Sequence, residues 1–163
     1  MKNYIFIGAI LLAVYLILTK GKGTGASSQN RNMKKSFTET DAINGLLKIS
    51  KEVGKERAQL LERILRLETA HFTSGQYRQT GSAGMEEGKW KNLPSYTTIP
   101  FKDNQDGHIG NFIVWNSVYD FLNYLNDYID RYNGNFARWN TTDTNRQKEY
   151  ISKVNSIKNR IIV

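Results

Sequence analysis

Glu68 is the residue of this chain whose type and position most clearly suggest chemistry. The spacing of apolar residues predicts a helix over 55–72. At roughly 100° per residue, Glu68 falls on the apolar face of this helix, between Ile64 and Leu65. Burial disfavours the charged form of a carboxyl group, which must then be paired, hydrogen-bonded or protonated. A glutamate that is protonated near neutral pH can act as a general acid.

Two structural explanations compete with catalysis at Glu68. An arginine such as Arg63 or Arg66 could hold the carboxylate in the core, or Glu68 could be a solvated residue at the end of the helix. Structural ion-pair networks also perturb the pKa of buried acids. Periodicity alone therefore leaves all three interpretations open.

The helices that position Glu68 are indicated by capping residues and by glycine. Thr40 or Asp41 can cap a first helix, and Gly54 separates it from the helix of Glu68. Ser117 is expected to cap a later helix. The apolar stripe of that later helix comprises Val118, Phe121, Leu122, Leu125 and Ile129.

Between these helices, residues 73–111 are rich in glycine, short polar residues and aromatics. Strands are expected at 95–101 and 108–115, around a DNQDG turn. A last helix should run over about 144–161. This order predicts an α+β domain over residues 37–163, mainly helical, in which a small β lobe forms one wall of a cleft.

The first 36 residues differ from this domain. Residues 4–18 are uncharged and almost wholly apolar, which predicts one N-terminal transmembrane helix within an anchor of residues 1–20, with residues 4–19 in contact with lipid. A cleaved signal peptide is the alternative. Residues 21–36 mix glycine, serine, asparagine and basic residues, as in a flexible tether. We therefore expect a single-pass membrane protein.

Most of the net positive charge of the chain lies in these first 36 residues. The 163 residues include 23 Lys and Arg and 15 Asp and Glu, and none of the acidic residues precedes the domain. A basic tether beside a membrane span favours contact with anionic lipid, or less often with nucleic acid through Arg31, Lys34 and Lys35. The positive-inside rule would keep the domain cytoplasmic, although an anchor in a virus membrane need not obey it.

Metal and thiol chemistry have little support in the sequence. The chain has no cysteine, which excludes disulfides and thiolate ligands. Its two histidines, His71 and His108, lack the spacing of a metal site, and no glycine-rich phosphate loop is present. We expect no metal and no other cofactor.

The segment LLERILRLETAHFTSGQY resembles the catalytic helix and following loop of lysozyme-like peptidoglycan hydrolases, most closely the glucosaminidases of glycoside hydrolase family 73. The motif of that family is Glu-Ser-Gly-Trp-Gly-x-Ser. Glu68, Thr69 and Ser74 stand at its corresponding positions. His71 and Phe72 stand where the family has Trp and Gly.

This resemblance implies a lysozyme-like fold and cleavage of the glycan strands of bacterial peptidoglycan, with Glu68 as proton donor. Weaker similarity covers most of residues 37–163, including Gly84 and Met85 in the β wall. The family also has two tyrosines near its last helix, of which Tyr150 matches the second and the first has no counterpart. The reaction is either hydrolysis or single-glutamate lytic transglycosylation.

A glycosidase usually needs a second carboxylate opposite its acid. Glu86 and Glu87 are the favoured candidates, because they lie in the predicted β wall. Asp103 and Asp106 are more typical of a tight turn.

Sugar contacts are expected from side chains in the loops around Glu68. Flat aromatic faces suit the apolar faces of pyranose rings, and hydroxyl groups suit their polar edges. The predicted substrate contacts are Ser74, Tyr77, Trp90 and Tyr150. Tyr96, Trp115 and Trp139 are further aromatic candidates, more typical of packing.

The main rival to an enzyme is a non-catalytic, membrane-anchored structural protein, for example of a virion, whose lysozyme-like body binds glycan. A short anchor, a basic tether and a wall-degrading domain would together suit a bacteriophage particle that opens the cell wall during infection. They would equally suit an enzyme of the bacterial envelope.

Overall fold

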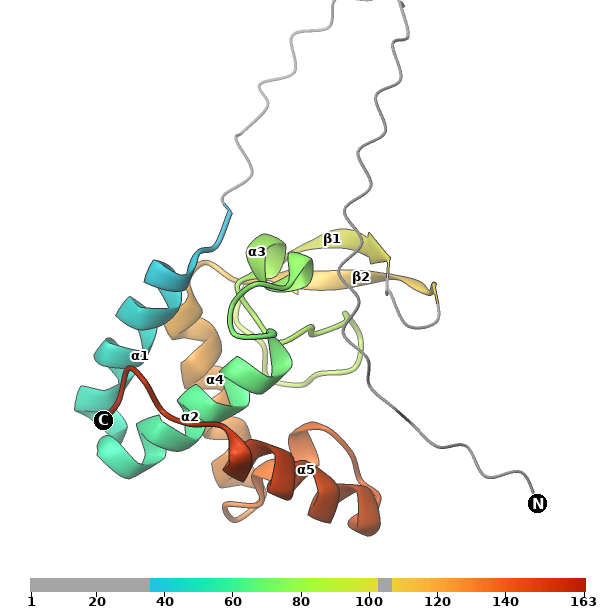
Figure 1. Cartoon of the computed structure of the whole chain (residues 1–163). Helices are drawn as coiled ribbons and strands as arrows, with labels where there is room; N and C mark the ends of the chain where they lie inside the picture. The colour runs from blue at the N-terminus through green and yellow to red at the C-terminus, as the bar shows by residue number, and fades with distance from the viewer. Residues whose placement is uncertain (1–35, 103–106) are drawn as a thin grey trace, which may run out of the picture. The chain divides into compact units, whose positions relative to one another are not determined.

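The computed structural model of the chain describes residues 36–102 and 107–163 (Figure 1). The predicted anchor of residues 1–20 and nearly all of the tether lie outside these residues. Within the described ranges, no helix is both long enough and apolar enough to cross a membrane. Asp103 and Asp106 of the predicted DNQDG turn also fall outside them.

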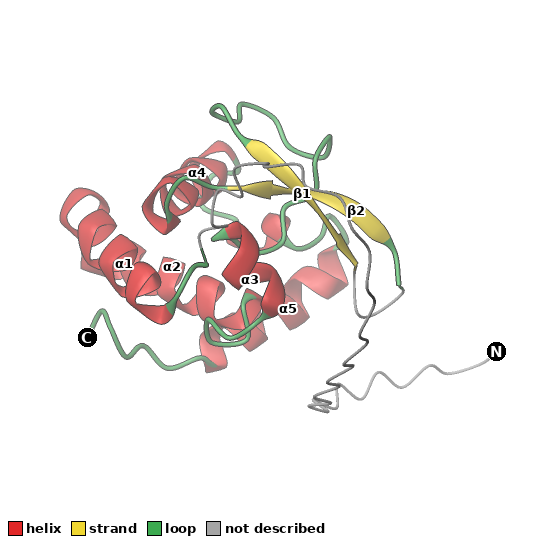
Figure 2. Ribbon diagram, turned by 90° about the horizontal axis from the view of Figure 1, so that it is seen from above, coloured by secondary structure: helices red, strands yellow, loops and turns green. Residues whose placement is uncertain are grey.

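The described elements confirm the predicted α+β class, mainly helical with one small sheet (Figure 2). In chain order they are α1 (Glu39–Val53), α2 (Lys55–Glu68), α3 (Gly75–Thr80), β1 (Thr97–Lys102), β2 (Ile109–Val114), α4 (Val118–Arg131), the 3-10 helix η1 (Phe136–Trp139) and α5 (Thr144–Ser156). The short helices α3 and η1 were not expected from periodicity, since each is too short to display it.

The first two helices meet at a glycine, as predicted. Gly54 has a φ of +82°, a conformation that is strained for residues with a side chain, and it separates α1 from α2. The cap of α1 is Thr38 and not Thr40 or Asp41: the Thr38 hydroxyl accepts the N–H of Asp41, and the Thr38 N–H donates to the Asp41 carboxylate at 2.8 Å. Asp41 is therefore the third helical residue of a capping box.

The sheet is an antiparallel hairpin in which Thr97 lies opposite Val114 and Lys102 opposite Ile109. Both strands agree with the predicted ones to within two residues at each end. Glu86 adds an isolated bridge to β2, so the segment before the hairpin also lies along it. The hairpin projects from the helical body on the side away from α1 (Figures 1 and 2).

The core fixes α2, which ends in Glu68, between other helices. α1 packs against α2 and α4, and α2 also packs against α5. The predicted stripe of α4 is confirmed as buried, from Val118 to Ile129. Each fully buried leucine or phenylalanine contributes roughly 1.5–3 kcal/mol. The helix that carries Glu68 is therefore held rigidly along its length.

The last helix is shorter than predicted, because the chain leaves it at Ser156 and returns along α2 (Figure 1). The C-terminal segment, residues 157–163, is bound by the carboxylate of the fully buried Glu62. This carboxylate accepts hydrogen bonds from the N–H groups of Arg160 at 2.8 Å and Ile162 at 2.9 Å. It also accepts Nε of Arg66 at 2.8 Å. Burial alone would raise the pKa of Glu62, but these hydrogen bonds hold it below its ordinary value.

Candidate active site

Glu68 is the last residue of α2, which ends there because the backbone turns left-handed. Thr69 is the C-cap, and Ala70 follows with a φ of +48°. The N–H of His71 donates to the carbonyl of Arg66 at 2.8 Å, the bond that defines a Schellman helix end. The helix is therefore four residues shorter than predicted, and Glu68 stands at its rim.

The loop after Glu68 continues in left-handed conformation through His71 (φ +56°) and Phe72 (φ +69°). The buried Thr69 supports this course, since its hydroxyl donates to the carbonyl of Leu65 at 2.6 Å and accepts the N–H of Phe72 at 3.0 Å. A non-glycine residue in such a conformation costs roughly 1–3 kcal/mol, and such strain clusters at functional sites. The hydrogen bonds of Thr69 thus hold the loop beside Glu68 in backbone angles that its residues would not adopt by themselves.

Two predicted substrate contacts turn out to hold the fold together. The hydroxyl of Ser74 accepts the N–H of Tyr77 at 3.1 Å and caps α3. Tyr77 has no exposed surface, and its hydroxyl donates to the carbonyl of Thr38 at 2.7 Å. The prediction of a sugar contact is wrong for Tyr77, because a fully buried ring cannot stack on a ligand. Ser74 already has a structural task as a helix cap.

Glu68 and Tyr150 face each other across the packed helices α2 and α5. The Tyr150 hydroxyl donates to Oε1 of Glu68 at 2.6 Å, the short distance of a bond to a carboxylate. Tyr150 is buried, whereas Glu68 is partly exposed. The carboxyl group is therefore oriented by one partner, and Glu68 as a residue keeps some contact with solvent.

The surroundings of Glu68 favour its protonated form. Burial raises the pKa of Glu68 above its ordinary value and outweighs the hydrogen bond from Tyr150 and the positive charge of Lys153, which both lower it. Burial and the adjacent carboxylate raise the pKa of Tyr150 as well, so its hydroxyl keeps its proton. The pair can hold a transferable proton on Glu68.

Among the described residues, no arginine forms an ion pair with Glu68. Arg66 pairs with Glu62, at 2.8 Å and in the core, and Arg63 forms no ion pair with Glu68 within the described part of the chain. The same helix therefore carries two glutamates in opposite environments. At Glu62 the hydrogen bonds outweigh burial and lower the pKa, whereas at Glu68 burial outweighs the bond from Tyr150 and the charge of Lys153 and raises the pKa.

The two candidates for a second carboxylate lie in the β insertion. Oε1 of Glu86 is 2.9 Å from Nε2 of His108, and its other oxygen forms an ion pair with Lys89. Hydrogen bonds from Lys89 and then His108 hold the pKa of Glu86 below its ordinary value. Glu87 is exposed. Among the described residues, neither carboxylate forms a hydrogen bond with Glu68.

The remaining aromatic candidates divide by exposure. Trp115 and Trp139 are buried, at 4% and 7% exposure, and belong to the core. Trp90 is partly exposed and packs on Trp139 with ring centroids 4.5 Å apart. Tyr96 is 40% exposed. Trp90 and Tyr96 thus retain surface that a ligand could contact.

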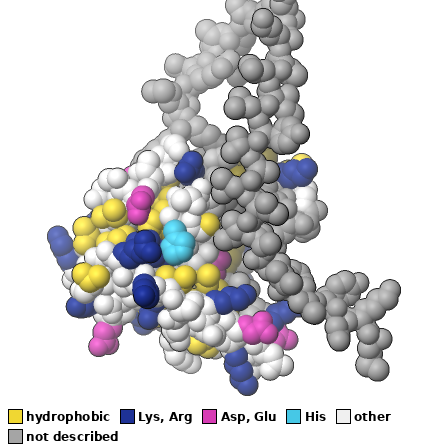
Figure 3. Space-filling view, in the orientation of Figure 1, with side chains coloured by type: hydrophobic (Ala, Val, Ile, Leu, Met, Phe, Trp, Pro, Cys, Tyr) yellow, Lys and Arg dark blue, Asp and Glu magenta, His cyan; other side chains and the backbone are white. Residues whose placement is uncertain are grey.

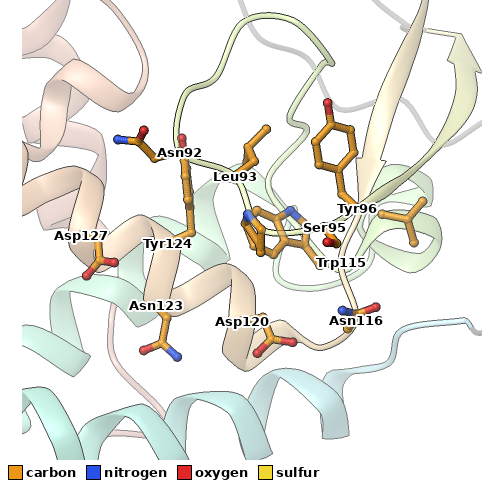
Figure 4. A pocket seen from close by; sticks show the side chains of 12 residues that line it. Asn92, Leu93, Ser95, Tyr96, Trp115, Asn116, Asp120, Asn123, Tyr124 and Asp127 are labelled. Carbon is orange, nitrogen blue, oxygen red and sulfur yellow. The ribbon is translucent and has the colours of Figure 1, made fainter.

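Cavities between the β insertion and the helical body lie along α4. One of about 520 Å³ is lined by loop residues such as Leu93 and Tyr96, by Trp115, and by Asn123 and Asp127 of α4 (Figure 4). Another, of about 640 Å³, lies between residues 89–92, the C-terminal part of α4 and η1. Glu68 lines neither cavity. In both, the insertion faces α4 and not the end of α2.

The described residues contain no group of three His, Asp or Glu that could hold a metal ion. His71 is exposed, and His108 is occupied with Glu86. On the face drawn in Figure 3, Lys and Arg side chains are scattered among neutral and hydrophobic ones. The visible surface lacks the continuous basic stripe that typifies nucleic-acid binding.

Two residues around the site were missed by the sequence reasoning. Lys153 follows Tyr150 by three residues, and Glu62 precedes Arg66 by four, both spacings that place side chains on one helix face. Those spacings could have indicated both residues from the sequence.

Comparisons of the chain with protein-family models, with curated proteins and with solved structures find no match.

Proposed function

We propose that this protein cleaves the glycan strands of bacterial peptidoglycan and that Glu68 protonates the glycosidic oxygen. The observation that carries the proposal is the Glu68–Tyr150 pair. Glu68 is desolvated yet partly exposed, is bound by a tyrosine hydroxyl at 2.6 Å, and has a raised pKa. A general acid for neutral pH requires this combination of a held proton and an accessible carboxyl group.

The course of the loop supports the resemblance to the lysozyme-like glucosaminidases. Their motif has glycine at the two positions that Ala70 and Phe72 occupy here, and both residues have positive φ, +48° and +69°. Glycine is the residue that adopts such angles most readily. The chain keeps the glycine-type backbone with other side chains, which favours a lysozyme-like fold for residues 37–163.

The proposed reaction begins with transfer of the Glu68 proton to the bridging oxygen while the bond from that oxygen to the anomeric carbon breaks. The bonding electrons stay on the oxygen, and the sugar becomes oxocarbenium-like. Tyr150 donates to the carboxylate as its charge develops. In hydrolysis, water then attacks the anomeric carbon and gives its proton to the Glu68 carboxylate, which restores the acid. In lytic transglycosylation, the sugar's own 6-hydroxyl attacks instead, returns its proton to Glu68 in the same way, and leaves a 1,6-anhydro end.

For hydrolysis, we propose Glu86 over Glu87 as the second carboxylate. Glu86 forms a bridge to β2, and Lys89 and His108 hold its carboxylate in place, whereas Glu87 is exposed. A carboxylate in a fixed position suits stabilisation of a positive sugar. Glu86→Gln should then slow hydrolysis strongly, whereas transglycosylation, which needs only Glu68, should be little affected.

Membrane attachment is a separate part of the proposal. Residues 4–18 are proposed to anchor the protein in a bacterial envelope or a virion membrane. The full chain should sediment with membranes and be released by detergent, and deletion of residues 1–20 should make it soluble. If mass analysis of the expressed protein shows that its first residues are missing, the N-terminal segment is instead a cleaved signal peptide.

The test of the enzymatic proposal compares the full chain in detergent with its Glu68→Gln variant on purified peptidoglycan. Loss of a general acid should slow clearing by about 10²–10⁴-fold. Glu52→Gln is the matched control, because Glu52 is also bound by a tyrosine hydroxyl, that of Tyr119 at 2.8 Å, but is exposed.

Equal clearing by both forms, or clearing by neither, would refute the mechanism. Retained binding of peptidoglycan without clearing would instead favour the structural glycan-binding protein. Mass analysis of the products then distinguishes the two reactions, because only transglycosylation leaves a 1,6-anhydro end.

A further inference from the structure

The cavity of about 640 Å³ beside η1, here called the aromatic–basic cavity, has a wall of unusual composition. Its aromatic members are Trp90, Tyr124, Tyr128, Tyr132 and Trp139. Its charged members are Lys89, Lys91, Arg131 and Arg138, and none of the acidic residues that the structure describes lines it. A cavity of this size is within the usual range of ligand sites.

The aromatic residues form one packed cluster. Trp90 lies 4.5 Å from Trp139 and 5.8 Å from Tyr128 between ring centroids, and Tyr128 lies 4.8 Å from Tyr132. Trp90 and Tyr128 are partly exposed, and Tyr132 is exposed. The cluster thus offers apolar ring surface to a ligand that has an apolar face of its own.

Most of the positive charge in this wall is not neutralised. Lys89 pairs with Glu86, but Lys91, Arg131 and Arg138 have no carboxylate partner among the described residues. The guanidinium groups of the two arginines lie over tyrosine rings: Arg138 is 4.6 Å from the Tyr132 centroid. Cation–π contacts position a charge without cancelling it.

Two residues of the wall each have a buried donor that lacks an acceptor among the described residues. The Nε1 group of Trp90 and the Nε group of Arg138 are buried without a hydrogen-bond partner among the described residues. Unpaired buried donors are rare in folded proteins and are costly. These two donors have no accessible surface, so they are not offered to a ligand. The ring surface and the uncompensated positive charge together fit a ligand that carries both rings and anionic oxygens.

We propose that the aromatic–basic cavity binds a saccharide segment bearing a carboxylate or a phosphate. Residues 140–142 form part of its wall and lead directly into Asp143, the N-cap of the helix that carries Tyr150. A glycan bound here would lie against the segment that leads to the Glu68–Tyr150 pair. The choice of a saccharide rests on the proposed function, whereas the preference for negative charge rests on the cavity alone.

Single-stranded nucleic acid shares this chemistry but fits the cluster less well. It stacks its bases on open aromatic faces. In this cavity the rings of Trp90 and Tyr128 meet at 64°, those of Tyr128 and Trp139 meet at 89°, and Trp139 is buried. The cluster therefore presents no series of parallel open faces.

The test measures binding by the full chain with Glu68→Gln, so that no probe is cleaved. The probes are neutral chitohexaose, a tetrasaccharide of alternating N-acetylglucosamine and N-acetylmuramic acid with free carboxylates, chitohexaose phosphorylated on its sugars, and a ten-residue oligothymidylate. At low salt, at least one anionic saccharide should bind about tenfold more tightly than the neutral one, the gain expected from two or three charge contacts. The tighter of the two names carboxylate or phosphate as the recognised group.

Lys91→Gln with Arg131→Gln should remove this preference, and both residues are exposed, so the fold should survive. Lys51→Gln with Lys158→Gln is the matched control, because it removes the same charge from exposed positions outside the cavity. Equal affinity for neutral and anionic saccharides overturns the proposal. It is also overturned by a preference that survives the first double variant or disappears equally in the control, and by tightest binding of the oligothymidylate.

The binding test separates this proposal from the proposed function. If the charge preference fails while the unsubstituted chain clears peptidoglycan and Glu68→Gln does not, only the cavity proposal is wrong. If the preference holds and nothing is cleared, only the catalytic proposal is wrong.

Discussion

Replacement of Tyr150 by phenylalanine tests the pairing at the centre of the candidate site. The substitution removes one hydroxyl and leaves the ring, so the packing of α5 should persist. The lost bond, 2.6 Å long, stabilises the charged form of Glu68 and thereby lowers its pKa. Without it, the pKa of Glu68 should rise further, because burial is then opposed only by the charge of Lys153.

The size of the effect follows from the difference between two hydrogen bonds. A bond to a charged group contributes about 1.5–3 kcal/mol and a bond to a neutral group about 0.5–1.5 kcal/mol. The difference is about 1–1.5 kcal/mol, which displaces a titration by about one pH unit. The basic limb of the rate profile, where Glu68 loses its proton, should therefore move up by about that amount.

The stability of the variant should change with pH in a matching way. Because the folded pKa of Glu68 is raised, the stability contributed by its neutral form is complete below the ordinary value of 4.5 and is lost as the pH rises through the folded pKa. Tyr150 offsets part of that loss. Tyr150→Phe should thus destabilise the protein more above the folded pKa than below it.

The assay is the pH dependence of peptidoglycan cleavage, together with a carbon-13 titration of the Glu68 carboxyl group, assigned by its absence in Glu68→Gln. Tyr119→Phe is the control, since it removes a tyrosine hydroxyl that binds the exposed Glu52. A basic limb that stays in place or moves down would refute the reasoning. An equal displacement in Tyr119→Phe would refute it as well.

Three further substitutions test the frame around the site. Glu62→Gln should cost about 3–5 kcal/mol, because it leaves Arg66 unpaired in the core; since the pKa of Glu62 is lowered, the loss measured by chemical unfolding should shrink as the pH falls through the folded pKa, and a constant loss would contradict the ion pair. Ala70→Gly should leave the free energy of unfolding unchanged or raise it by up to about 1 kcal/mol, because glycine adopts a positive φ without strain. A clear fall in melting temperature would show that the angle is not strained in Ala70. Thr69→Val should cost about 1–3 kcal/mol, since it leaves the buried N–H of Phe72 without its acceptor, and an unchanged melting temperature would contradict that role.

The parts of the fold that periodicity could predict are those with long, regular patterns. The buried stripe of α4 and the break at Gly54 follow from spacing and from glycine, and both are confirmed. The ends of α2 and α5 could not be predicted, because tertiary contacts set them. α2 ends where the Thr69 hydroxyl binds the N–H of Phe72 in the following loop. α5 ends before the segment whose N–H groups bind the carboxylate of Glu62, such as that of Arg160.

The candidate site was predictable only in part for the same reason. The sequence of α2 alone was enough to single out Glu68, because a helical pattern shows an acidic residue on an apolar face. Tyr150 was expected near the substrate through a resemblance, but its bond to Glu68 joins residues 82 positions apart, which no local pattern encodes. Tyr77 was misassigned because a buried tyrosine in the core and an exposed one in a cleft look alike in sequence.

The most direct measurement of the central claim is the rate of peptidoglycan cleavage per folded molecule for Glu68→Gln and Glu62→Gln. Both variants change a glutamate on the inward face of α2 by one atom. Glu68→Gln should keep its stability and lose at least about 100-fold in rate, because the proton donor is gone. Glu62→Gln should lose stability but retain most of its rate. A Glu68→Gln variant that cleaves at the unsubstituted rate would contradict the account.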